Sequence, residues 1–557
     1  MPQELRQLPA IILISLAQKL WFLVSQPVHF LHHLVEMIKR NYLPIDRNTK
    51  VFISHNEEKW GKWKTPNTKP IILFDYYPVA ETEIARSYLL NILAKKFNSR
   101  IVSYSSNRIR NRSWDKIYRS FNVCEHVHIR LSNIQNIEAE KTFNNVIKKI
   151  DTRKDLFDLE IFGVHLGVEI YEEYLMRYVE PTVYLNDERL HPIIKEAIES
   201  LIFWRDFFQE CEVKAIVSAN IGVRLRGNLP VKVAGQLYGI PFYSTHARGI
   251  TFYREPHLFQ EEVWKKFLNY PERFRKLSEE EQSAGILWAK ERIKKRLSGK
   301  IGVDMAYSTK SAFKRDQNHS PVTKQNSKLK VLVATHEFYD SPNCYGGLLF
   351  IDFYEWLLFL GDVSKKTDYD WYIKTHPDVM EKSKTILQRF VRDFPNFTLV
   401  PEETSFHQLA NEKIKFVLTC YGSVGHECPL LGMNVINAGN NPHMGYTFNW
   451  HPKSTGEYLD LLLNLNSLSK RTDFHDIYEF YFMHYKKEGI IDDWIYPSYK
   501  MLVDQYSEKF RFGSEIFPYF VKSLSDEKHL KIIQNMTNYI NSGTTGSAYT
   551  INHDPGR

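Results

Sequence analysis

Residues 415–437 read KFVLTCYGSVGHECPLLGMNVIN, and this stretch decides the fold. An apolar run ends at Thr419, a glycine-rich turn follows at 422–425, and a second apolar run begins at Asn434. The residues between the two runs favour a helix that opens at His426. A strand, a turn, a helix and a second strand in this order predict two parallel strands joined by a helical crossover.

The same alternation continues on the N-terminal side of this stretch. Short apolar runs separated by longer helical segments predict a parallel sheet that is covered by helices on both faces. The predicted strands are 329–335, 371–374, 397–400, 415–419 and 434–437, and the predicted helices are 347–361, 382–393 and one that starts at Phe406.

A second alternating series lies in the first half of the chain. It begins with PIILFD at 70–75, an apolar run that ends in a charge and is typical of a buried strand. We therefore expect an α/β protein with two Rossmann-like, doubly wound domains that face each other across a cleft. The further strands of this series are predicted at 100–104, 215–218 and 240–243, and its helices at 81–97 and 228–238.

Residues 311–328 (SAFKRDQNHSPVTKQNSK) contain few large apolar side chains, which is the composition of a linker between domains. The predicted organisation is an N-terminal amphipathic helical segment at 1–45, a first Rossmann-like domain at 46–310, the linker at 311–328, a second Rossmann-like domain at 329–474, C-terminal helices at 475–541 that pack back on the first domain, and a disordered tail at 542–557.

Charge and cysteine content exclude several classes of protein. The net charge is only +8 over 557 residues and the basic residues are spread out, so no nucleic-acid partner is expected. The five cysteines form no CxxC pair, which argues against a disulfide framework or a structural zinc site and favours a reducing cytoplasm.

The apolar run at 8–16 is shorter than the ~20 residues that a spanning helix needs. Residues 8–38 form either a helix on the inner face of the cell membrane or a helix packed on the protein itself.

Polar side chains follow the strands of the second series where each strand ends, and ligands of an open α/β sheet bind at these carboxyl ends. In the turn at 422–425, backbone N–H groups and the Ser423 hydroxyl suit a phosphate, although an ordinary strand-to-helix turn uses the same residue types. Glu427 either caps the following helix or accepts the hydroxyls of a ribose.

Lys374 and His376 lie at the end of the predicted strand 371–374, and Pro377 fixes the turn after it. A lysine supplies a positive charge and a histidine supplies a hydrogen-bond donor, which together suit the phosphate of a leaving nucleotide. The alternative interpretation is a surface lysine beside a capping histidine.

The Lys-x-His-Pro motif at 374–377, followed by the Gly-Ser turn at 422–423 and by Glu427, resembles the capsule-polysaccharide glycosyltransferases of the GT-B fold. It is similar in particular to the bacterial Kdo and sialic-acid-type transferases, which use CMP-sugars, and to the teichoic-acid glycerophosphotransferases, which use CDP-glycerol. In the first half, the stretch GVHLGVE at 163–169 resembles the acceptor domain of the surface-carbohydrate branch, although that branch usually has Asp at the position of Glu169.

The resemblance implies that a nucleotide-sugar lies on the second domain and that a glycan or glycolipid acceptor lies on the first. A base in the first domain would deprotonate the acceptor hydroxyl, and its candidates are Glu169, Asp187 and His246. Arg248 and Arg254 would hold an anionic acceptor or a sugar carboxylate. The candidate nucleotide-sugar-binding residues are His336, Asp340, Lys374, His376, Thr404, Ser405, Gly422, Ser423, Val424 and Glu427.

The letters DYD at 368–370 precede a strand instead of ending one, so no metal site is expected. Positive groups and helix dipoles would then support the leaving phosphate in place of a metal ion. No cofactor is expected beyond the nucleotide-sugar co-substrate.

Three functions are open from the sequence. The first is transfer of an ulosonic acid, such as Kdo or a sialic-acid-like sugar, from a CMP-sugar to a surface polysaccharide or glycolipid. The second is a CDP-glycerol-type polyol-phosphate transferase, or a UDP- or GDP-sugar transferase, on the same fold. The third is a non-catalytic scaffold of polysaccharide export, against which the intact residues Lys374, His376, Ser423 and Glu427 argue.

Overall fold

The computed structural model describes residues 45–543 and 546–547, apart from internal gaps at 62–68, 106–111, 219–224, 247–248, 254–258, 302, 304–309, 315–319, 344–345, 470–472 and 488–512. The predicted helix at 8–38 lies outside the described residues, as do Arg248, Arg254 and the side chain of His246. In the part of the chain that is described, no helix is long and apolar enough to cross a membrane.

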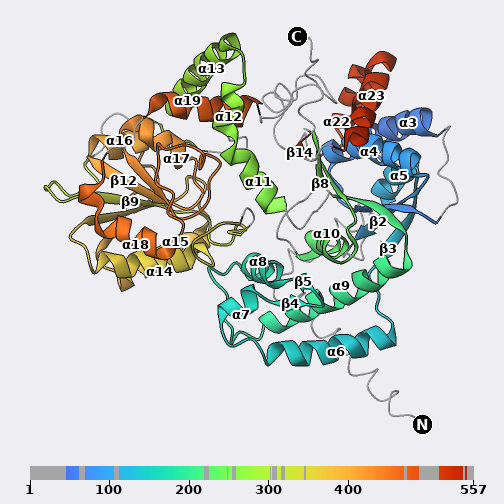
Figure 1. Cartoon of the computed structure of the whole chain (residues 1–557), viewed down its shortest axis with the longest axis horizontal. Helices are drawn as coiled ribbons and strands as arrows, with labels where there is room; N and C mark the ends of the chain where they lie inside the picture. The colour runs from blue at the N-terminus through green and yellow to red at the C-terminus, as the bar shows by residue number, and fades with distance from the viewer. Residues whose placement is uncertain are drawn as a thin grey trace.

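Six strands from the first half of the chain and one from its C-terminal end build a seven-stranded sheet, on the right of Figure 1. Its strand order is β14-β8-β7-β6-β1-β2-β3, and the five strands from β7 to β3 are parallel while β8 and β14 are antiparallel. The strands are β1 (Ile71–Asp75), β2 (Arg100–Ser105), β3 (Val123–His128), β6 (Val213–Ser218), β7 (Phe242–His246), β8 (Gly249–Tyr253) and β14 (Gly546–Ser547).

The second half builds a five-stranded sheet, on the left of Figure 1, in the order β11-β10-β9-β12-β13 with every neighbouring pair parallel. The two parallel arrays confirm the predicted α/β class, and each strand predicted from the sequence is present. The strands are β9 (Lys330–Ala334), β10 (Asp370–Lys374), β11 (Phe397–Leu399), β12 (Ile414–Thr419) and β13 (Asn434–Asn437).

Apolar side chains cover both faces of each sheet. In β9, Val331 and Val333 belong to one hydrophobic cluster, whereas Leu332 and Ala334 belong to another on the opposite face. The strand β1 divides in the same way, and all five of its residues are buried. A strand that is buried on both faces has a continuous apolar run, which is why these runs were readable in the sequence.

Helices supply the layers on both faces. In the first half the helices are α3 (Arg47–Trp60), α4 (Ala80–Phe97), α5 (Arg112–Ser120), α6 (Asn133–Ile147), α7 (Arg153–Phe157), α8 (Gly167–Tyr178), α9 (Leu190–Glu210), α10 (Leu225–Tyr238), α11 (Phe259–Leu268), α12 (Tyr270–Arg275) and α13 (Glu279–Leu297), with a small hairpin of β4 (Glu160–Ile161) and β5 (Val164–His165). Helices α12 and α13 pack in a separate apolar cluster with Ile477 and Phe480 of the second half. In the second half they are α14 (Phe353–Ser364), α15 (Glu381–Asp393), α16 (Phe406–Asn411), α17 (Val424–Glu427), α18 (Thr455–Leu463) and α19 (Phe474–Phe482), with 3-10 turns at Cys428–Leu431 and Leu465–Ser467 and a π-helical turn at Met483–Lys487.

The helix predicted at 347–361 begins later, at Phe353. Gly346 and Gly347 have φ of 68° and 70°, a left-handed conformation that a continuing helix does not accept. Asp352 then caps the helix, and its carboxylate accepts the Glu355 N–H at 2.7 Å. The loop between β9 and α14 is therefore longer than the sequence predicts.

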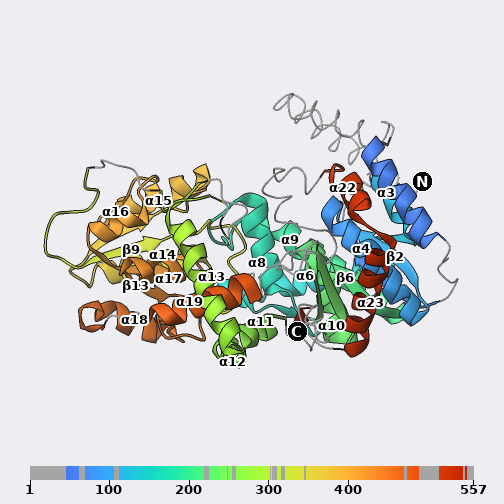
Figure 2. The same ribbon diagram turned by 90° about the horizontal axis from the view of Figure 1, so that it is seen from above.

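The last helices, α22 (Ile516–Ser523) and α23 (Asp526–Ser542), return to the first sheet, as Figure 2 shows beside α3 and α4. Phe517 stacks on Phe52 of α3 with ring centroids 4.4 Å apart, and the Tyr88 hydroxyl of α4 lies 2.8 Å from His529 Nδ1. Beyond them, Gly546 and Ser547 pair with β8, so this part of the tail predicted to be disordered forms an edge strand because β8 offers it an unpaired edge.

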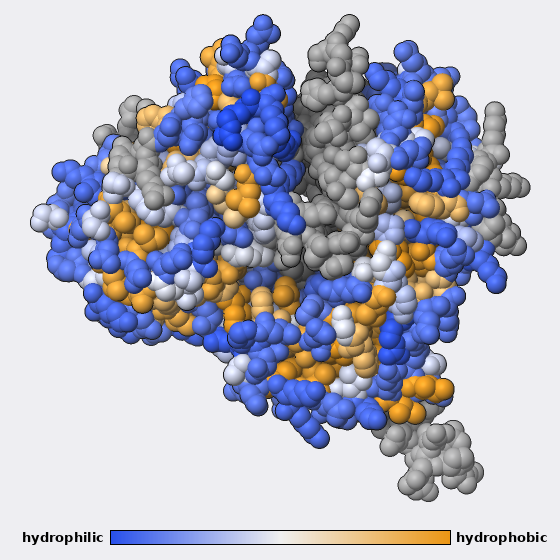
Figure 3. All heavy atoms as spheres, viewed as in Figure 1, coloured by the Kyte–Doolittle hydropathy of each residue, from blue (hydrophilic) through white to orange (hydrophobic). Residues whose placement is uncertain are grey.

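The surface seen in Figure 3 is mostly hydrophilic, with apolar side chains in several separate patches on both halves and toward the bottom. Ile134 and Ile137, one turn apart on α6, are 80% and 71% exposed. Scattered apolar side chains of this kind are ordinary on folded proteins.

Candidate active site

The strand order of the second sheet reverses between β9 and β12. Successive strands run from β9 to β10 and β11 on one side, and from β12 to β13 on the other. Crossover connections leave the sheet in opposite directions at such a point, which opens a crevice outside the carboxyl ends of the two central strands. These ends carry His336, two residues after β9, and Thr419, the last residue of β12.

His336 joins the two strand ends. Its Nε2 lies 3.2 Å from Thr419 Oγ1 and accepts the backbone N–H groups of Cys420 and Tyr421 at 3.3 Å each. An accepting Nε2 places the proton of the neutral ring on Nδ1. Burial lowers the pKa of His336 to about 3, so the ring stays neutral near pH 7. His336 thus holds the start of the turn that follows β12.

The glycines of this turn are required by close neighbours. A Cβ on Gly422 would stand 2.8 Å from Thr419 Oγ1, and one on Gly425 would stand 2.4 Å from His443 Cε1. The His443 ring is 1% exposed, and neither of its nitrogens has a hydrogen-bond partner within the described residues. Burial holds the pKa of His443 well below its usual range, so a neutral ring underlies the turn.

Glu427, at the end of α17, is held by two partners. Arg296 of α13 donates from Nε to Oε1 at 2.7 Å, and the Ser423 hydroxyl donates to Oε2 at 2.9 Å. The carboxylate and the guanidinium are both buried, at 5% and 8% side-chain exposure. Glu427 therefore links the turn to a helix that precedes the second sheet in the sequence, and its predicted contact with a ribose stays a prediction.

Lys374 and His376 lie at the end of β10, the strand beside β9. Lys374 is 2% exposed, and its ammonium donates to the Glu402 carbonyl at 3.0 Å. Burial lowers the pKa of Lys374 to about 8, against the opposing charges of Glu402 and Glu403. An ammonium has three N–H groups, and in the described residues one of them has an acceptor.

His376 is exposed at the strand end, and its Nδ1 accepts the Asp378 N–H at 3.2 Å. This contact leaves the proton on Nε2, which becomes a donor. Although the His376 side chain reaches solvent, the protein atoms around the ring partly desolvate it, and this desolvation lowers the pKa of His376. The charges of Asp340 and Arg296 act on the pKa of this ring, and His376 acts on that of His336, so these side chains share one region of the strand edge.

The remaining predicted donor-site residues lie along the same edge. Ser405 caps α16, and its hydroxyl accepts the Gln408 N–H at 3.2 Å. Thr404 is buried beside it, and its N–H bonds to the Pro401 carbonyl. Val424 begins α17, and Asp340 is exposed in the loop after β9.

The acceptor-side candidates have strong partners of their own. Glu169 is 1% exposed; Lys232 Nζ lies 2.6 Å from its Oε1 and Asn228 donates to the same oxygen at 3.0 Å. Asp187 is held by Arg189 and by the Tyr174 hydroxyl, which lower its pKa well below the usual range. Of His246 only the backbone is described, at the end of β7.

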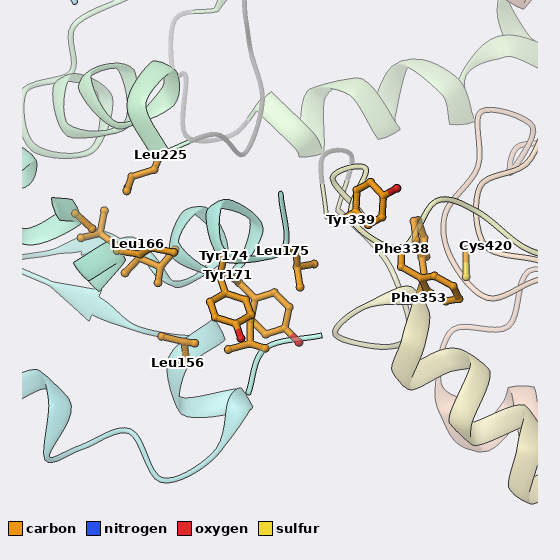
Figure 4. Packing of buried hydrophobic residues seen from close by; sticks show 14 of the residues in the cluster. Leu156, Leu166, Tyr171, Tyr174, Leu175, Leu225, Phe338, Tyr339, Phe353 and Cys420 are labelled. Carbon is orange, nitrogen blue, oxygen red and sulfur yellow. The ribbon is translucent and has the colours of Figure 1, made fainter. Parts of the chain in front are cut away.

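Helix α8 connects the two halves of the chain. The Tyr171 hydroxyl donates to Asp352 Oδ2 at 2.5 Å, and the Asn343 N–H donates to Glu172 Oε1 at 2.8 Å. Figure 4 shows α8 between Leu225, the first residue of α10, and Tyr339, in the loop that follows β9. We call the contacts of Tyr171 and Glu172 with this loop the α8 interface.

Glu172 makes the α8 interface sensitive to pH. Its Oε2 is buried without a hydrogen-bond partner within the described residues, and burial raises its pKa from 4.5 to about 8, with Asp352 and Glu169 adding to the rise. Across this window the folded chain keeps a proton that the unfolded chain releases, so this group makes stability fall as the pH rises.

We expect Glu172→Gln to raise the free energy of unfolding by about 1–3 kcal/mol at about pH 9, because the amide stands in for the protonated carboxyl. Near pH 4 the variant and the parent should unfold alike. Thermal unfolding across this pH range measures the difference, with the exposed Glu188→Gln as the control. A Glu172→Gln variant whose stability parallels the parent at every pH would contradict the expectation.

Sequence reasoning missed two features of the site. Arg296 contacts Glu427 across 131 positions of sequence, and nothing near Arg296 marks it as part of a site. His443 follows an Asn-Pro pair beyond β13, and only the packing on Gly425 identifies it.

No protein-family model and no curated protein matches the chain. Among solved structures, it is similar to the β-Kdo 2,4 transferase KpsC of Thermosulfurimonas dismutans, with a TM-score of 0.30, 13% identity and coverage of 48% of this chain and 79% of that one. It is also similar to a glycosyltransferase from Rickettsia africae ESF-5 (TM-score 0.24, 9% identity, 82% and 100% coverage). A third is a putative UDP-N-acetylglucosamine 2-epimerase from Listeria monocytogenes (TM-score 0.21, 11% identity, 74% and 94% coverage). TM-scores of this size establish neither a common fold nor a common activity.

Proposed function

We propose that the chain is a nucleotide-sugar-dependent glycosyltransferase that moves a sugar onto a surface-polysaccharide or glycolipid acceptor. The observation that carries the proposal is the strand-order reversal of the second sheet, with Lys374, His376 and the Gly422 turn along its carboxyl edge. Such an edge binds nucleotides in many α/β proteins, and here it offers a cation and an imidazole donor beside the start of a helix.

In this proposal the donor phosphate lies between Lys374 and His376. Lys374 supplies charge from a largely dehydrated position, where its interaction with a phosphate is strong. His376 donates from Nε2 to the leaving oxygen. These groups take the place of a metal ion, because they stabilise the negative charge that develops as the bond to the sugar breaks.

The acceptor would bind on the first half, across a cleft from the donor. The α8 interface supports this arrangement, because it joins the loop after β9 to the helix beside α10. We propose a CMP-linked ulosonic acid as the donor, on the resemblance of the Lys-x-His-Pro and Gly-Ser motifs. CDP-glycerol and UDP- or GDP-sugars are the alternatives, and a non-catalytic scaffold would bind none of these nucleotides.

Isothermal titration calorimetry with CMP, CDP, UDP and GDP tests the proposal directly. We expect one of them to bind, and Lys374→Met to weaken that binding by about 10- to 150-fold, since a hydrogen bond to a charged group contributes roughly 1.5–3 kcal/mol. The matched control is Lys365→Met, a surface lysine paired with Asp362. Absence of binding by the parent chain for all four nucleotides would overturn the proposed function.

The same titration has a pH dependence. Only the charged form of Lys374 attracts a phosphate, and the lowered pKa of about 8 means that the free chain loses this form as the pH rises through that value. We expect the affinity to fall above about pH 8, approaching tenfold per pH unit, and to do so in the parent chain but not in Lys374→Met. An equal pH dependence in both would remove Lys374 from the phosphate site.

A further inference from the structure

A buried ionic network closes the carboxyl end of β1 in the first sheet. Arg86 of α4 donates from Nη1 to the Asp75 carbonyl at 2.7 Å and to Glu83 Oε1 at 2.8 Å, and its Nη2 pairs with Asp75 Oδ1. The Tyr118 hydroxyl donates to the same oxygen of Glu83 at 3.1 Å. Arg86 and Glu83 are 0% exposed, whereas Asp75 reaches 8%.

This network is an inefficient way to stabilise the folded state. Burial of the Arg86–Asp75 ion pair costs several kcal/mol in desolvation, and apolar residues of similar volume often do as well or better. Glu83 Oε2 and Arg86 Nε are buried without a hydrogen-bond partner within the described residues, which adds to the cost. A costly arrangement that fixes one carboxylate at a strand end therefore points to a role for that carboxylate.

Asp75 stands where the strand order of the first sheet reverses. From β1 the successive strands continue to β2 and β3 on one side, while β6 and β7 lie on the other. Asp75 ends β1 and Ser218 ends β6, so Asp75 borders the crevice where ligands of such sheets bind. Arg86 occupies Asp75 Oδ1, and no described residue donates a hydrogen bond to Oδ2.

Contacts through α8 connect the first sheet to the loop that follows β9 in the second sheet. Helix α10 follows β6, and its Asn228 and Lys232 bind Glu169 of α8. Two residues further along α8, the Tyr171 hydroxyl donates to Asp352, the residue that caps α14. Asp352 ends the loop that follows β9, and His336 lies near the start of this loop. Helix α8 is thus bound both by α10, which follows β6, and by Asp352, at the end of the loop that follows β9 (Figure 4).

We propose that Asp75 is the general base of the transfer, taking the proton of the acceptor hydroxyl on Oδ2, an inference that rests on the proposed function. The acceptor oxygen forms a bond to the anomeric carbon, and the bond from that carbon to the phosphate oxygen breaks. Its electron pair leaves with the nucleotide, and the hydroxyl proton moves to Asp75. Arg86 is a positioning residue, because it fixes Oδ1 and so aims Oδ2 at the crevice.

The other carboxylates fit this role less well. Both oxygens of Glu169 are bound by Lys232, and both oxygens of Asp187 are bound by Arg189. A base needs an unoccupied oxygen and a fixed orientation, and among the described residues Asp75 has both.

The test compares Asp75→Asn with the full-length parent and with Asp158→Asn, an exposed carboxylate paired with Lys154 on α7. Calorimetry first measures binding of CMP, CDP, UDP and GDP. Nucleotide release is then followed from CMP-N-acetylneuraminate, UDP-N-acetylglucosamine and CDP-glycerol, with water or added oligosaccharide as the acceptor. We expect Asp75→Asn to bind nucleotide as the parent does and to turn over about 10²- to 10⁴-fold more slowly, while Asp158→Asn keeps full turnover.

A second readout separates a base from a structural residue. The acid limb of the parent's pH–rate profile should disappear in Asp75→Asn, and added formate should restore part of the rate to Asp75→Ala by supplying a carboxylate. Full turnover in Asp75→Asn, or an unchanged acid limb, overturns the role of Asp75 and leaves the proposed function standing. A parent chain that binds none of the four nucleotides overturns the proposed function, and this inference with it.

Discussion

Replacing His376 with Ala is expected to slow turnover by about a hundred- to a thousandfold, since loss of one donor to a developing oxyanion costs roughly 2.7–4 kcal/mol. Asp378 fixes the ring through Nδ1, which leaves Nε2–H to donate to the leaving phosphate. The lowered pKa of His376 keeps the ring neutral near pH 7, so it acts as a hydrogen-bond donor and not as a cation. The interaction strengthens as charge develops, and kcat should fall more than KM rises.

Steady-state kinetics on the donor identified by calorimetry measure this effect. The control is His475→Ala, an exposed histidine at the start of α19 on the same half of the chain. Unchanged kcat in His376→Ala would place the leaving group elsewhere. A rise in KM alone would mean that His376 binds the donor without assisting the reaction.

The second large effect concerns stability. Arg296→Met should lower the free energy of unfolding by about 3–5 kcal/mol, because it leaves the Glu427 carboxylate buried and uncompensated. Arg296 also lies with its guanidinium 5.6 Å from the centre of the Phe313 ring, so methionine retains part of the packing. The double variant Arg296→Met/Glu427→Gln should recover most of the loss.

Chemical denaturation of the two single variants and the double variant gives the coupling energy of the pair. Arg389→Met, on the exposed face of α15, serves as the control for removal of an arginine. Losses that simply add in the double variant would show that the 2.7 Å contact contributes no specific stability.

The sequence predicts the sheets well, because their strands are buried on both faces and so appear as unbroken apolar runs. It places Lys374 and His376 at a strand end for the same reason. It misplaces the start of α14, because the two glycines before Asp352 adopt a backbone that composition alone does not reveal. The boundaries between domains and the roles of the individual site residues stay predictions.

Sequence patterns do not predict the contacts between segments that are distant in the chain. The Arg296–Glu427 pair and the α8 interface join residues 131 and 181 positions apart, so no local spacing marks them. Asp75 is a different case, because PIILFD at 70–75 ends in a charge just as the strands of the second series end in polar residues. Applied equally to both sheets, the strand-end rule would have singled out Asp75.

The return of α22 and α23 to the first sheet sets an order of assembly during synthesis. Ile72 and Phe74 of β1 share a hydrophobic cluster with Phe517, Phe520 and Met536, which emerge from the ribosome more than 400 residues later. At about 5–20 residues per second, this part of the core waits roughly 20–90 s for its partners. One face of the first sheet is thus completed last, and the nascent chain depends on protection of that face until its final helices arrive.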